Sequence, residues 1–270
     1  MTTIVSFKIP DGIVVAADSA MTTKKGKLGA NRYDSYEKLC QVGQLPVVVA
    51  MWGSALTGGR TVANLVNEFA RIQGYEDPST SHWTMGELAE ELAGHVQQAA
   101  EEGKNCGCAT AKLDLLLSGY SKDRPFPEQW HLRFPKGAVK RRYAERGLAI
   151  SWDGVTEDIR TLWWGHHPSL ARILTKHGVS QEQQRAILKD LEARAAWGPE
   201  RVDFAMPLAD AARLVEFLVW VQVTAERFRP GLARSAGPID VVVVRQEGVT
   251  WLRRKSVGRL LGQESWTAPV

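Results

Sequence analysis

Hydrophobic and β-branched residues near the start of the chain form two short runs that are separated by a turn. The runs cover residues 3–8 and 13–17, and Pro10-Asp11-Gly12 lies between them. Because proline, aspartate and glycine favour tight turns, this pattern predicts a β-hairpin. After a polar loop over residues 22–34, a second strand pair is predicted at residues 36–42 and 45–51.

Further along the chain, apolar residues recur every three or four positions, which indicates amphipathic helices. The pattern predicts helices over residues 57–73, 84–102 and 208–228, and helical pieces between residues 156 and 197. Thr84 and Glu87 have the spacing of a capping box at the start of the second helix. Gly165, Pro168 and Gly178 are expected to interrupt the helical pieces, since these residues end helices.

Strand patterns return in the middle and at the end of the chain. They cover residues 113–120, 129–134 and 148–151, followed by a last hairpin over residues 240–244 and 249–253. Strands and helices therefore occur in separate blocks, which favours an α+β protein with antiparallel sheets. We expect a four-layer αββα sandwich in which the first and last hairpins complete the sheets. A single domain over residues 1–258 and a tail over residues 259–270 are predicted.

The charge and the cysteines narrow the possible functions. The 34 basic and 30 acidic residues nearly balance and give a net charge of +4, so no nucleic-acid partner is required. The basic run at residues 136–146 is interpreted as a solvated connection. Three cysteines without a secretory signal argue against a disulfide framework and favour a cytoplasmic setting. No apolar stretch reaches the length of a membrane span, and no metal or other cofactor is expected.

A threonine at the second position introduces a possible chemistry. A threonine hydroxyl attacks a carbonyl group only when a base takes its proton, and an α-amino group on the same residue is such a base. The pKa of an α-amino group, about 7.7–8.0, suits this role near neutral pH. Thr2 would have a free amine if Met1 were removed. Such a site also needs a carboxylate, a cation and N–H donors for the oxyanion.

Five segments at and near the two ends of the chain share a pattern with a known family. They are Thr2-Thr3-Ile4-Val5, DGIVVAADS at residues 11–19, Lys38-Leu39, Gly53-Ser54-Ala55, and SAGPIDVVV at residues 235–243. These segments resemble proteasome β-subunits and the bacterial HslV peptidase, which are N-terminal-nucleophile hydrolases. Asp18 follows Thr2 by sixteen residues, which is the interval found in that family.

The resemblance implies a threonine-type peptidase or amidase. Thr2 would be the nucleophile and its own amine would relay the proton. Lys38 would lower the barrier electrostatically, with Asp18 holding it, and the Gly53 N–H would bind the oxyanion. Ser235 would support the site from the far end of the chain. The resemblance also implies peptide or protein substrates, assembly into a homo-oligomer or ring, and an ATPase regulator.

Two departures from the family leave alternatives open. Residues 231–234 lack the aspartate that normally precedes the serine matched by Ser235, and Ser151 is an imperfect match to a supporting serine in mid-chain. One alternative is an inactive homologue that retains Met1 and serves as an assembly or binding module. Another is an amide hydrolase that acts on small molecules with the same nucleophile.

Overall fold

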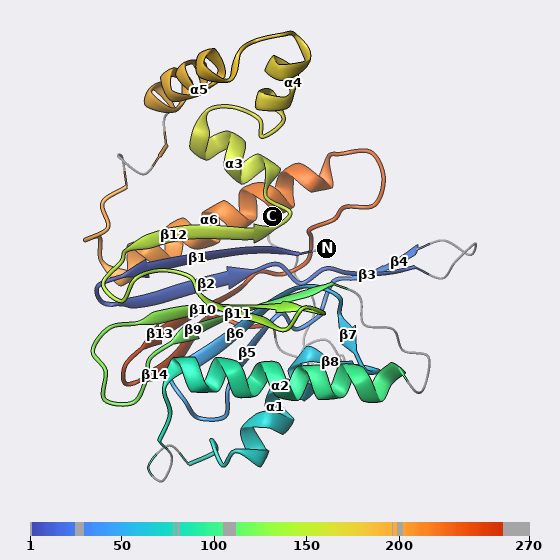
Figure 1. The fold of residues 1–270 in the computed structure, drawn as a ribbon, viewed down its shortest axis with the longest axis vertical. Coiled ribbons are helices and arrows are strands. Elements are labelled where there is room, and N and C mark those ends of the chain that lie inside the picture. The colour runs from blue at the N-terminus through green and yellow to red at the C-terminus, as the bar shows by residue number, and fades with distance from the viewer. Residues whose placement is uncertain are drawn as a thin grey trace, which may run out of the picture.

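Two antiparallel sheets of five strands each face one another at the centre of the molecule (Figure 1). This computed structural model describes residues 2–24, 30–77, 79, 82–104, 112–195, 197–198 and 202–255. The first sheet contains, in spatial order, β12 (Ala149–Gly154), β1 (Thr3–Ile9), β2 (Gly12–Ala17), β13 (Asp240–Arg245) and β14 (Gly248–Arg253). The second contains β11 (Ala138–Arg141), β10 (Glu128–Phe134), β9 (Leu113–Gly119), β6 (Val47–Gly53) and β5 (Leu39–Gln41).

The space between the two sheets is filled by apolar side chains from both. Ile4 and Val15 from the first sheet and Leu116 from the second are fully buried in this cluster. The opposite face of the first sheet is also covered, since Val5 and Phe7 pack into a second cluster with the helices. Every residue of β1 is therefore buried, which explains why its sequence is nearly continuous in β-branched and apolar residues.

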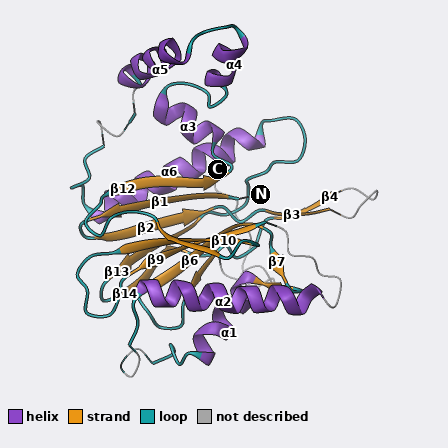
Figure 2. Ribbon diagram, viewed as in Figure 1, coloured by secondary structure: helices purple, strands orange, loops and turns teal. Residues whose placement is uncertain are grey.

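Helices cover the outer faces of both sheets (Figure 2). The second sheet is covered by α1 (Val62–Ile72) and α2 (Met85–Lys104), and the first by α6 (Leu208–Arg227). Helix α3 (Glu157–Trp164) packs on α6. Helices α4 (Leu170–Lys176) and α5 (Gln181–Arg194) lie farther out, and none of their residues is buried. The expected α+β class with antiparallel sheets is confirmed. The first and last hairpins, however, lie together in one sheet.

Two predicted loops contain strands. A hairpin of β3 (Met21–Lys24) and β4 (Ala30–Tyr33) forms in the polar segment over residues 22–34. The basic run contains β11, in which Val139 packs against the core while the flanking Ala138 and Lys140 are exposed. Both segments lie at edges, where polar and charged side chains are compatible with a strand. Because of this polar and charged composition, the two segments were predicted to be loops rather than strands.

The predicted starts of two elements near the site were wrong. A tight hairpin of β7 (Leu56–Thr57) and β8 (Arg60–Thr61) precedes α1, which begins only at Val62. Gly58 and Gly59 have positive φ values of 58° and 77°, as a two-residue hairpin turn requires. The strand predicted at residues 36–42 shortens to β5, so that Lys38 lies directly before it. The predicted tail at residues 259–270 and Cys106 and Cys108 lie outside the described residues.

The contact between the sheets gives a direct test of the fold. Replacing the fully buried Leu116 by alanine is expected to lower the free energy of unfolding by about 2–5 kcal/mol, because it opens a cavity between the sheets. Leu252, which is 52% exposed, provides the control, and its replacement by alanine should change stability by about 0.5 kcal/mol or less. Urea denaturation measures both. Equal effects would contradict the packing described here.

Candidate functional site

Asp18, which directly follows β2, is the centre of a buried polar cluster. Its side chain is fully buried and accepts four hydrogen bonds. Oδ1 accepts from Thr3 N at 2.8 Å and from Lys38 Nζ at 2.7 Å. Oδ2 accepts from Ala20 N at 3.2 Å and from Ala236 N at 3.0 Å. A buried carboxylate requires such donors, and here they come from four segments of the chain.

Thr2 lies between the ends of β12 and β2 and is only 5% exposed. Its carbonyl oxygen accepts a hydrogen bond from Val155 N at 2.7 Å, and Thr3 Oγ1 donates to Val155 O at 2.8 Å. Gly154 permits this close approach, because a Cβ atom there would lie 1.8 Å from Thr2 O. The Thr2 carbonyl group and the residue that follows it are thus held in place.

Lys38 connects the two sheets at this site. It precedes β5 in the second sheet, where its carbonyl oxygen accepts from Met51 N at 3.1 Å, and its Nζ reaches Asp18 in the first sheet. Burial lowers the pKa of Lys38 below its ordinary value, although the charge and hydrogen bond of Asp18 act in the opposite direction. A cation held by a carboxylate is the kind of group that lowers the energy of a developing negative charge.

Gly53 and Ser235 lie at the same end of the molecule. Gly53 ends β6 two residues beyond Met51 and has a φ of 99°; no hydrogen bond among the described residues joins it to Thr2. Ser235 Oγ is fully buried and has no hydrogen-bond partner in the described part of the chain. The next residue, Ala236, donates to Asp18. Because buried polar groups are normally hydrogen-bonded, this hydroxyl is a candidate to bind a further polar group.

Ser151 does not reach this cluster. Its Oγ lies 2.8 Å from Ser6 Oγ, and these two residues are opposite one another on β12 and β1. The residue that pairs with Thr3 is Gly154, three positions further along β12. The proposed match of Ser151 to a supporting serine is therefore not reflected in the geometry.

A second buried ion pair next to the site was missed from the sequence. Asp240 begins β13 opposite Ala17 and forms an ion pair with Lys255 Nζ. Its Oδ1 also accepts a hydrogen bond from Lys255 N at 2.8 Å. The only sequence signal was an acidic residue directly before a run of four valines. Lys255 carries positive charge near Lys38 and contributes to its lowered pKa.

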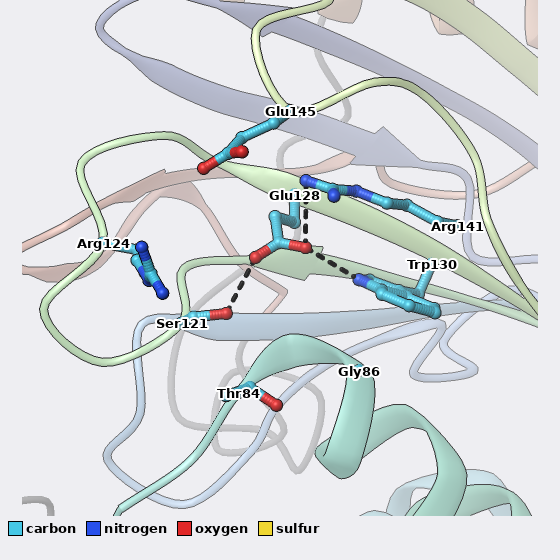
Figure 3. Close-up of a pocket in the computed structure, with 8 residues that line it drawn as sticks. All are labelled: Thr84, Gly86, Ser121, Arg124, Glu128, Trp130, Arg141 and Glu145. Atoms are coloured by element: carbon cyan, nitrogen blue, oxygen red, sulfur yellow. Dashed lines mark hydrogen bonds and ion pairs between the residues drawn. The ribbon is translucent and has the colours of Figure 1, made fainter.

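A cavity of about 300 Å³ lies at the opposite end of the second sheet (Figure 3). Its central group is Glu128, whose carboxylate accepts from Ser121 Oγ at 2.8 Å and Trp130 Nε1 at 3.2 Å and pairs with Arg141 at 3.2 Å. Ser121 Oγ also accepts from Met85 N at 2.8 Å. This cluster fixes the start of α2 to the sheet. It is separate from the Thr2 site, because Ser121 and Glu128 lie at the end of the sheet remote from Gly53.

Across the part of the chain that the structure describes, no three histidine, cysteine, aspartate or glutamate side chains gather as a metal site. None of the described helices is both long enough and apolar enough to span a bilayer.

Comparison with known proteins identifies the fold. No protein-family model and no curated protein matches the sequence. Among the solved structures that match are three Anbu structures, each of which is covered over most of its length. A Gly-1 mutant of Anbu from Hyphomicrobium sp. strain MC1 has a TM-score of 0.57 and 16% identity, covering 94% of this chain and 86% of its own. Anbu from Yersinia bercovieri, described as an ancestral beta-subunit, has a TM-score of 0.53 and 14% identity, covering 99% and 100%.

The third structure is the helical assembly of the Anbu complex from Pseudomonas aeruginosa. It has a TM-score of 0.54 and 14% identity and covers 96% of this chain and 90% of its own. At these identities the similarity establishes the fold alone. The chain therefore has an Anbu-like fold.

Removal of the Lys38 charge tests the cluster. The Lys38→Met variant is expected to lose about 3–5 kcal/mol of unfolding free energy, because the Asp18 carboxylate would remain buried without its cation. Lys189→Met, on the exposed surface of α5, is the control and should be nearly neutral. Chemical denaturation of both variants measures the difference. A Lys38→Met protein as stable as the control would show that the pair is not formed in solution.

Proposed function

We propose that this chain is an N-terminal-threonine hydrolase of peptide or amide bonds, built on a four-layer αββα sandwich. Thr2 is the nucleophile once Met1 has been removed. The observation that carries the proposal is the Asp18 carboxylate, which joins the backbone N–H next to Thr2 to the buried Lys38 cation. This arrangement supports the proposal, because a buried carboxylate and a cation lie next to the backbone that follows Thr2.

The proposed reaction has two steps. In the first, Thr2 Oγ1 attacks the substrate carbonyl carbon while the Thr2 amine takes the hydroxyl proton. The amine then passes this proton to the leaving amine, and an acyl ester on Thr2 remains. In the second step, water attacks the ester and releases the acid and the free hydroxyl. Lys38, held by Asp18, stabilises the negative charge that develops near Oγ1.

We assign the Gly53 N–H as the hydrogen-bond donor to the oxyanion. Glycine is required at this position, because its φ is positive and a Cβ atom would lie 2.3 Å from Lys112 O. Its location at the Lys38 end of β6 supports this role. Ser235 Oγ, buried and unpaired in the described part of the chain, is proposed to bind the Thr2 amine or the water of the second step.

Self-association forms part of the same proposal. The Anbu structure from Pseudomonas aeruginosa is a helical assembly, and we propose that this chain likewise forms a homo-oligomer, as a ring or a helix, fed by an ATPase. Large apolar side chains on and beyond α6 support an interface, since Trp220, Phe228 and Leu232 are all more than half exposed. If the assembly encloses the sites, entry into it, rather than the chemistry of the site, would determine which substrates are cleaved.

The nucleophile is tested by substitution. Thr2→Ala is expected to lower hydrolysis of fluorogenic peptide amides by a factor on the order of 10³ or more, because the attacking oxygen is lost. Thr2→Ser, which keeps a hydroxyl and an amine, is the matched control and should retain activity. The intact mass of each protein must show loss of Met1. An active Thr2→Ala protein would contradict the proposal, and an inactive wild type that retains Met1 would favour an assembly module without catalysis.

The pH dependence follows from two amino groups of the site, the Thr2 amine that acts as base and the Lys38 cation. Activity is expected to rise as the Thr2 amine loses its proton, near the α-amino pKa of about 7.7–8.0. It should fall again at a pH below 10.5, because burial lowers the pKa of Lys38 and the cation is lost as the pH rises through that pKa. In Lys38→Arg the alkaline limb should move upward, since a guanidinium keeps its charge. Identical alkaline limbs in the two proteins would exclude Lys38 as the group concerned.

A further inference from the structure

Arg234 lies one residue before Ser235, and its guanidinium joins two carboxylates from different helices. Nη1 and Nη2 donate to the two oxygens of Glu157 at 3.0 and 3.2 Å. Nη2 also donates to Glu226 Oε1 at 2.6 Å, and the backbone N–H of Arg234 donates to Glu226 Oε2 at 2.8 Å. One planar side chain thus connects the start of α3 to the end of α6, a geometry that lysine cannot reproduce.

The Glu226 end of this connection is buried. Only 2% of Glu226 is exposed, and Arg229 adds a further hydrogen bond to its Oε1 at 2.7 Å. Burial pushes the pKa of Glu226 upward, but the hydrogen bonds from Arg234 and Arg229 outweigh this effect and hold it below its ordinary value. The carboxylate therefore stays charged at neutral pH and holds Arg234 in place.

The Glu157 end of the connection leads directly to the candidate nucleophile. Glu157 begins α3 two residues after Val155. Val155 N donates to Thr2 O at 2.7 Å, and Val155 O accepts from Thr3 Oγ1 at 2.8 Å. A shift of the start of α3 would therefore move the backbone that holds Thr2.

The loop that carries Arg234 leads to the central carboxylate. Two residues later, Ala236 N donates to Asp18 Oδ2 at 3.0 Å, and Ala236 O accepts from Ser19 N at 3.1 Å. Ser19 Oγ donates to Pro238 O at 2.7 Å in the same loop. Three hydrogen bonds thus join this loop to the segment that contains Asp18.

We propose that Arg234 is a positioning residue of the hydrolytic site. By joining Glu157 to Glu226, it holds the Val155 segment and the Ala236 loop at a fixed separation, and so aligns Thr2 with Asp18 and Lys38. This inference rests on the proposed role of Thr2. Arg234 touches neither Thr2 nor the reacting atoms, and acts only through the two backbone segments.

The experiment compares Arg234→Met and Arg234→Lys with the wild type, with Thr2→Ala, and with Arg213→Met as control. Arg213 is a matched choice, because it lies on α6 and is 83% exposed. On fluorogenic peptide amides, Arg234→Met should lower kcat by about 10- to 100-fold with KM within about twofold, since misplacement affects the reacting atoms more than binding. The kcat of Arg234→Lys should lie between those of Arg234→Met and the wild type, and the kcat of Arg213→Met should equal that of the wild type. All assays are run at the same interval below each protein's Tm.

The outcomes separate this inference from the proposed function. A wild type whose hydrolysis does not depend on Thr2 overturns the proposed function and this inference with it. Thr2-dependent hydrolysis together with an unchanged kcat in Arg234→Met overturns the inference alone. Should Arg234→Met not fold, Arg234→Lys and Glu157→Gln carry the test, and unchanged kcat in both has the same meaning. A rise in KM with kcat preserved would place Arg234 in substrate binding and also overturn it.

Discussion

The buried carboxylate of Asp18 is the group on which the rest of this structure depends. A charge without water requires donors, and each donor here belongs to a different part of the chain: the segment after Thr2, the turn after β2, the strand start at Lys38 and the loop at Ala236. Because charge-assisted hydrogen bonds are about twice as strong as neutral ones, the carboxylate favours one arrangement of all four. The site and the junction of the two sheets are consequently the same structural feature.

Two further ion pairs lie near the Asp18 cluster. The pairs Asp240–Lys255 and Glu226–Arg234 are also largely buried, and each joins two segments within residues 226–255. Buried ion pairs contribute little net stability, but they penalise any arrangement that separates the partners. These pairs therefore specify the relative positions of their segments more than they stabilise the fold.

The parts of the structure that follow local rules could be predicted from the sequence. The hairpin of β1 and β2, the helix after Thr84 and the final hairpin depend on turn residues, capping and periodicity, all visible within a few positions. The strand β11 could not be recognised, because an edge strand tolerates a lysine and arginine pattern that is also typical of a loop. The connection made by Arg234 and Glu226 could not be predicted from the sequence, because it depends on Glu157, which is 77 residues away from Arg234. Asp18 and Lys38 were found only because a family resemblance supplied the long-range relation.

The position of β13 between β2 and β14 has a consequence for how the molecule is made. Asp18 receives one of its donors from Ala236, 218 residues later, and β2 lacks its partner β13 until residues 240–245 have been synthesised. Contacts between such distant residues form late, because a large loop must close first. In a growing polypeptide, the Asp18 carboxylate would thus lack one of its four donors, and the segment after Thr2 would remain incompletely assembled, until residues 236–245 have been synthesised.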